Sequence, residues 1–178
     1  MTEEPMVATD PLQQHGATAT DVLVGAIAGV AATVAMTLAA AAMHRHLPES
    51  QRYPLPPREL TEQALARGGG HRPGLVAATL ASHFGFGAAV GGLYGFLRLG
   101  RTPAAACSGI LYGLGVWTVS YLGWIPASRL LRPATGHPAR RNALMIAAHV
   151  VWGITLGVVD QRLRGSLAPF GAGTLKDR

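Results

Sequence analysis

The chain has 178 residues, of which 49% are hydrophobic and only 13% are charged. Soluble domains carry about 25% charged residues, so this composition argues against a soluble enzyme or binding domain. The net charge of +6 is spread between four apolar blocks and forms no single patch, which argues against a nucleic-acid partner and favours contact with lipid head groups. The one cysteine, Cys107, excludes an internal disulfide and a CxxC pair.

The first apolar block covers residues 22–43, and its sequence VLVGAIAGVAATVAMTLAAAAM has no charged side chain. A helix of this length crosses the roughly 30 Å hydrocarbon layer of a bilayer, so the block predicts a first membrane span. The residues before it include four acidic side chains and no lysine or arginine, which is the opposite of a signal peptide. We therefore expect residues 1–20 to form a mobile acidic tail.

A polar loop follows the first block, and within it residues 57–67 predict a short helix. Pro57 suits a first helical turn, Glu59 and Glu62 favour an N-terminal end, and the three glycines at 68–70 favour a stop after Arg67. This pattern is typical of a linker helix that rests on the membrane surface. A dedicated binding element is the alternative interpretation.

Three further apolar blocks predict spans, at residues 74–97, 104–127 and 142–159. The fourth block is the shortest, and charged residues stop it, namely Asp160, Arg162 and Arg164. The sequence therefore predicts an all-α fold, an integral membrane four-helix bundle over residues 21–164, followed by a second mobile tail at 165–178. Nine lysines and arginines lie in the first and third loops against six in the second loop and the tail, which by the positive-inside rule predicts both termini outside.

Every predicted span contains glycines four residues apart, a spacing that places them on one helix face. Such glycines let neighbouring backbones approach closely, so the four helices should pack tightly together. The predicted packing residues are Gly25, Gly29, Gly87, Gly91, Gly95, Gly109, Gly113, Gly153 and Gly157. Besides the lipid bilayer, exposed glycine faces would suit a homo-oligomer or a larger membrane complex as partners.

Spans two and four share the pattern His-x-x-x-Gly-x-x-x-Gly, which begins at His83 and at His149. Each histidine lies near the middle of its span and on the glycine face. The two spans run in the same direction, so we expect the imidazoles at similar depth. Together with the glycine pairs of spans one and three, the pattern indicates a duplicated two-helix unit.

An ionisable residue in the middle of a span is a functional candidate, and three interpretations of the histidines are open. In the first, each neutral imidazole bonds a neighbouring helix through a carbonyl, Thr118, Ser120 or Tyr121. In the second, His83 and His149 hold a haem iron or a metal between them, because bundle cores hold such cofactors and glycines leave room for a porphyrin. In the third, the chain is a small-solute transporter or channel subunit, which usually needs a buried carboxylate that these spans lack.

The sequence contains no G-x-S-x-G elbow, no Walker loop and no HExxH motif, so it predicts no catalytic residue. No metal site apart from the histidine pair is predicted either. These expectations favour a structural or accessory membrane protein over an enzyme.

Three segments carry a family resemblance: AGVAATVAMT in the first span, PLPPR at residues 54–58, and AHVVWGITLGVVDQRLR at residues 148–164. They resemble the YagU-like family of small polytopic bacterial inner-membrane proteins, in which His-x-x-Trp precedes a basic juxtamembrane segment. His149, Trp152 and Arg162 match that motif. The resemblance implies a multi-pass protein of a bacterial plasma membrane with a link to stress or acid tolerance. The acidic N-terminus departs from the family, which has arginines there.

Overall fold

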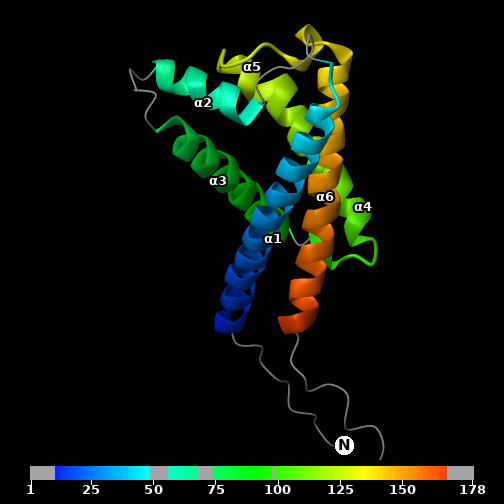
Figure 1. The fold of residues 1–178 in the computed structure, drawn as a ribbon. Helices are drawn as coiled ribbons and strands as arrows, with labels where there is room; N and C mark the ends of the chain where they lie inside the picture. Colours follow the sequence, from blue (N-terminus) through cyan, green and yellow to red (C-terminus); the bar gives the residue numbers. More distant parts are fainter. Residues whose placement is uncertain (1–10, 49–55, 68–73, 98, 168–178) are drawn as a thin grey trace, which may run out of the picture.

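The computed structural model describes residues 11–48, 56–67, 74–97 and 99–167, and within them every regular element is helical (Figure 1). The all-α prediction is confirmed for this part of the chain. The four long helices are α1 (Pro11–Arg45), α3 (Leu75–Phe96), α4 (Ala105–Thr118) and α6 (Ala139–Leu167). The short elements are α2 (Pro56–Arg67), η2 (Leu99–Arg101), η3 (Val119–Trp124), α5 (Ile125–Ala127) and η4 (Ala134–Gly136).

Four helical stretches are long and apolar enough to cross a membrane, namely Ala19–Arg45, Leu75–Phe96, Ala105–Ala127 and Ala139–Leu167. Their outward surface carries large apolar side chains that a water-soluble protein would normally bury. The most exposed of these, at 61% to 73%, are Leu23, Leu38, Val76, Leu111, Val119 and Leu167. Length, composition and surface together indicate a multi-pass membrane protein.

The four long helices alternate in direction, and α1 begins at the same end of the bundle where α6 ends (Figure 1). Helix α1 packs against both α3 and α6, and α6 packs against α4. Helices α3 and α4 meet through aromatic side chains instead of close backbones. The Tyr112 hydroxyl donates to the Val90 carbonyl at 2.8 Å, and the Tyr112 ring lies edge-on to Tyr94 at 5.2 Å. The helices therefore form a bundle in the spatial order α3, α1, α6, α4.

Helices α1 and α6 are both longer than the predicted spans. Helix α1 begins at Pro11, inside the segment predicted as a tail, and α6 continues to Leu167 instead of ending near residue 159. The Asp160 carboxylate pairs with the guanidinium of Arg164, four residues later in α6, at 2.7 Å. A pair with this spacing stabilises a helix, so the charged residues continue α6 instead of ending it. The remaining predicted tail residues, 1–10 and 168–178, lie outside the described residues.

The third span is not one straight helix, as a single span over 104–127 would imply. Helix α4 ends at Thr118, and a π-helical turn follows in which Gly123 has a non-helical φ of −109° and ψ of −105°. Pro126 follows three residues later, and it lacks the N–H that would continue the helical hydrogen-bond ladder. A π-turn shifts the faces of a helix, and here it leaves Ser120 and Tyr121 buried in the bundle.

Helix α2 occupies the segment for which a short helix is predicted, and it lies across the end of the bundle against α3 (Figure 1). Two arginine contacts attach it to other elements. The Arg141 guanidinium of α6 donates to the Glu59 carboxylate at 2.6 Å. The Arg67 guanidinium donates to the Ser128 carbonyl at 2.8 Å, just after α5. The surface of α2 that carries Glu59 and Arg67 is therefore bound to the chain's own bundle.

Candidate functional site

The predicted glycines of α1 and α3 face one another along a line that we call the α1/α3 seam, formed by Gly25, Gly29, Gly87, Gly91 and Gly95. A Cβ atom added to Gly91 would lie 2.7 Å from the Gly29 Cα, and one added to Gly25 would lie 2.8 Å from the Gly95 Cα. Real Cβ atoms do not approach backbone atoms so closely. Only glycine allows the two helices to approach this far.

A second line of contacts, the α4/α6 seam, is formed by Gly109, Gly113, Gly153 and Gly157. A Cβ atom added to Gly113 would lie 2.6 Å from the His149 carbonyl oxygen, and one added to Gly157 would lie 2.7 Å from the Ala105 carbonyl carbon. All nine predicted packing glycines are thus buried between helices of the same chain. The expectation that their faces are exposed for an oligomer is wrong, because intramolecular contacts already cover them.

His83 is half-buried at the α1/α3 seam, one turn before Gly87. Its Nε2 lies 3.2 Å from the Thr37 Oγ1 on α1. The Thr37 hydroxyl donates to the Thr33 carbonyl at 2.7 Å, so it is available as an acceptor, and the imidazole N–H is the donor. His83 therefore has a polar partner on the neighbouring helix, although Thr37 is not among the partners that the first interpretation names.

His149 is buried at the α4/α6 seam, with 8% of its surface exposed. Its Nδ1 lies 2.8 Å from the Met145 carbonyl oxygen, and a carbonyl can only accept, so Nδ1 carries the proton. The ring lies edge-on to Tyr121 at 6.2 Å. Met145 lies four residues earlier on α6 itself, so this bond does not reach a neighbouring helix as the first interpretation expects. The other two predicted partners bond elsewhere. Thr118 donates to the Leu114 carbonyl, and Ser120 accepts from the Trp124 indole.

The contacts of the two histidines repeat along the two seams. Thr37, which bonds His83, lies eight residues after Gly29, and Tyr121, which contacts His149, lies eight residues after Gly113. In both seams a glycine pair on the first helix faces the His-x-x-x-Gly-x-x-x-Gly helix. The glycine contacts themselves are offset by one helical turn, since Gly29 lies against Gly87 whereas Gly113 lies against His149. The duplicated two-helix unit therefore stays a prediction.

The structure does not favour one cofactor shared by the two imidazoles. The glycines that were expected to leave room for a porphyrin are covered by neighbouring backbone. The Nε2 of His83 is also engaged, by the Thr37 hydroxyl on α1. Within the described residues, no group of three or more His, Cys, Asp or Glu side chains could hold a metal ion.

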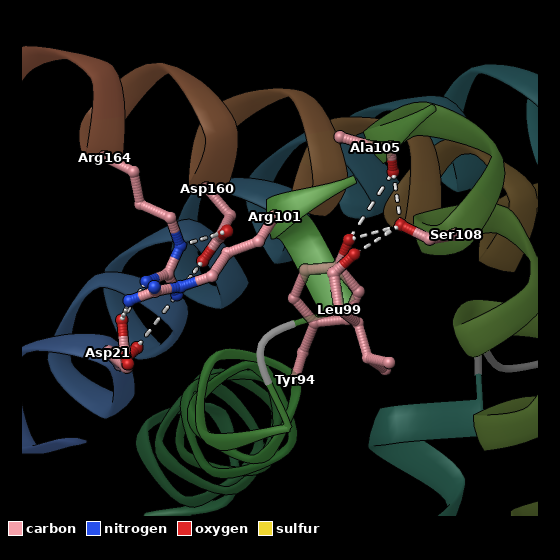
Figure 2. A network of polar contacts seen from close by, with 8 residues as sticks. All are labelled: Asp21, Tyr94, Leu99, Arg101, Ala105, Ser108, Asp160 and Arg164. Atoms are coloured by element: carbon pink, nitrogen blue, oxygen red, sulfur yellow. Dashed lines mark hydrogen bonds and ion pairs between the residues drawn. The ribbon is translucent and has the colours of Figure 1, made fainter. Parts of the chain in front are cut away.

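A second polar site, which the sequence did not predict, lies at the end of the bundle where α1 begins and α6 ends. We call it the clasp, and it consists of Asp21, Arg101, Asp160 and Arg164 (Figure 2). Arg164 donates to both carboxylate oxygens of Asp160, at 2.7 and 3.0 Å, and also pairs with Asp21. Arg101 donates to Asp21 at 2.8 Å. The clasp thus joins α1, the η2 turn and α6.

The two carboxylates of the clasp are almost completely buried, with 2% of Asp21 and none of Asp160 exposed. Gly100 makes room for Asp160, because a Cβ atom added there would lie 2.8 Å from the Asp160 Cγ. The adjacent turn is fixed by Ser108, which donates to the Leu99 carbonyl at 2.9 Å and lies 2.8 Å from the Tyr94 hydroxyl (Figure 2). Buried charges of this kind persist only when they are paired and hydrogen-bonded.

The clasp corrects the expectation, made for the transport interpretation, that the chain has no buried carboxylate. That expectation arose because the charged residues around the spans were interpreted as span ends. Asp21 and Asp160 are both buried carboxylates, although each is paired with Arg164. The i, i+4 spacing of Asp160 and Arg164 was the available sequence signal.

The fold defines a class, a small all-helical protein with four helices able to span a membrane. Comparison with known protein families, with curated proteins and with solved structures finds no match to the chain. The resemblance to YagU-like proteins therefore stays a prediction, and a function has to be argued from the residues and their geometry.

Proposed function

We propose that this chain is a structural or accessory protein of a bacterial plasma membrane, without an enzymatic activity of its own. One observation carries the proposal. The interior of the four-helix unit is occupied by close backbones, by two apolar clusters and by polar groups bonded to one another, whereas the outward surface is apolar. Such a protein acts through the surface that it presents to lipid and to other membrane proteins.

The resemblance to YagU-like proteins supplies the kind of membrane and the physiological setting of this proposal. It implies the bacterial inner membrane and a role under stress or in acid. Removing the gene should therefore lower survival at acid pH, and the full-length chain should restore it.

The test is complementation of the deletion strain with a variant in which both imidazoles are replaced, His83→Gln and His149→Gln. Under the structural proposal, this variant restores acid survival and the abundance of neighbouring membrane proteins in a membrane proteome. A double variant that inserts normally in the membrane but fails to restore survival would contradict the proposal, because it would give the imidazoles a chemical role. His137→Gln, at a half-buried position in the loop before α6, is the matched control.

A haem- or metal-binding bundle is the second candidate, and the geometry of His149 favours it. Histidines that bind metals usually donate their other N–H to a carbonyl, as the Nδ1 of His149 does to Met145. The purified protein would then show a Soret band or bound metal that His149→Ala removes and His137→Ala retains. A colourless, metal-free preparation would exclude this candidate.

A further inference from the structure

A cleft of about 590 Å³ opens at the clasp end of the bundle, between the start of α1, the η2 turn and the end of α6. Its wall combines charged and polar groups with apolar ones. The polar lining includes Arg101, Thr102 and Gln161, and the apolar lining includes Val24, Pro103 and Leu167. Its volume lies in the range of ligand-binding clefts.

Arg101 is the group in this cleft best placed to meet a ligand. One of its NH2 groups donates to the Asp21 carboxylate at 2.8 Å, and that carboxylate is buried, with 3% of the side chain exposed. The Arg101 side chain itself remains 49% exposed. Asp21 therefore holds the guanidinium at the mouth of the cleft. A guanidinium has several N–H donors in a planar fork that matches the oxygens of a phosphate.

The charges that line the cleft favour an anion. Two arginines and one aspartate line it, Arg101 and Arg164 against Asp21. Arg164 is engaged with both Asp21 and Asp160, so Arg101 supplies the exposed positive charge of the cleft. One exposed guanidinium suits one singly charged phosphodiester.

The position of the cleft favours a lipid as the source of that phosphate. Its residues lie at the ends of the stretches Ala19–Arg45 and Ala139–Leu167, both of which are long and apolar enough to cross a membrane. The ends of such helices lie at the depth of the lipid head groups. Val24 and Leu167 in the wall suit the glycerol and upper acyl region of a lipid.

We propose that this cleft binds the phosphate of an anionic phospholipid, with Arg101 as the phosphate ligand and with Thr102 and Gln161 as neighbouring hydrogen-bond donors. This site goes beyond the structural role proposed above and does not depend on it. A free phosphate ion offers the same chemistry, so the test has to separate the two sources.

The test follows thermal unfolding of the delipidated full-length protein in detergent with three additions: phosphatidylglycerol, phosphatidylcholine and inorganic phosphate. Phosphatidylglycerol should raise the unfolding midpoint most. Arg101→Gln should weaken its apparent affinity about tenfold or more, since one charge-assisted hydrogen bond is worth at least that factor. Arg162→Gln removes the same charge from the same end but lies outside the cleft lining, so it should change the affinity less than about threefold.

Two results would overturn the proposal. An equal loss in Arg162→Gln would show general attraction to a basic surface, and an equal response to inorganic phosphate would assign the site to a free ion. Should Arg101→Gln fail to fold because Asp21 loses a partner, Arg101→Lys and Thr102→Val replace it. Arg101→Lys keeps the charge but loses the planar fork, and Thr102→Val leaves the clasp intact. Unchanged affinity in both variants would refute the site.

Discussion

The two ends of the bundle are held together by different interactions. At the clasp end, α1 meets α3 and α4 meets α6 through glycines whose backbones touch, and four charged side chains join the helix ends. At the opposite end, which we call the α2 end, α3 diverges from α1 (Figure 1). Large side chains fill the core there, among them Tyr121, Ile125, Leu144 and Met145.

This difference shows two ways of holding together helices that are able to span a membrane. Lipid removes the hydrophobic drive for helix association, so close backbone contact and internal polar bonds have to supply it. The clasp end uses both, and its glycine seams have no room for added atoms. The α2 end uses bulky side chains, a bound surface helix and single polar contacts, so removing one polar contact there should cost less.

The largest effect should come from adding volume to a glycine seam. Gly91→Leu would place a side chain against the α1 backbone, and we expect a loss of more than about 3 kcal/mol and little folded protein. Gly85→Leu is the matched control, because Gly85 lies on the same helix and faces open space. Fluorescence-detected size exclusion measures the folded fraction. Equal elution profiles of the two variants would show that the seam does not hold α1 to α3.

Breaking the clasp should cost almost as much. Asp160→Leu leaves the Arg164 guanidinium with only one of its two carboxylate partners in a buried site, and we expect about 3–5 kcal/mol of destabilisation in detergent. Adding Arg164→Leu to the same protein should recover part of that loss, because the second change removes the poorly paired charge. A double variant less stable than the single one would contradict this account of the clasp.

The ion pair at the α2 end should matter less. Glu59→Gln weakens the bond to Arg141, but the Glu59 side chain is 25% exposed, so we expect about 1 kcal/mol. The unfolding midpoint should fall by a few degrees in the same detergent in which Asp160→Leu is measured. A loss as large as that of Asp160→Leu would remove the contrast between the two ends.

The smallest measurable effect should come from the polar contact across the diverging helices. Thr37→Val removes the hydroxyl that bonds His83 while keeping the side-chain shape, and we expect about 0.6 kcal/mol, the average for hydrogen bonds between membrane helices. Combining it with His83→Phe tests the pair in a double-mutant cycle. Strict additivity of the two changes would show that the contact contributes nothing.

Helix α2 shows how local signals predicted an element well. Its proline start, its acidic first turn and the glycines after Arg67 are all neighbours in sequence, and the helix has nearly the predicted bounds. The third span shows the opposite. Its apolar composition predicted one helix, but Gly123 and Pro126 break the regular ladder. The turn brings Tyr121 into contact with Met145 and His149 of α6, far along the chain.

The sequence by itself determined that the chain is helical, that four segments can cross a membrane, and that nine glycines lie on packing faces. These properties depend on local hydropathy and on the helical period. Only the tertiary structure decided that both glycine seams close within one chain, since a glycine face does not specify its partner. It also decided the clasp, because Asp21 bonds side chains that lie 80 and 143 residues away, and no local pattern shows that such charges will meet and be buried.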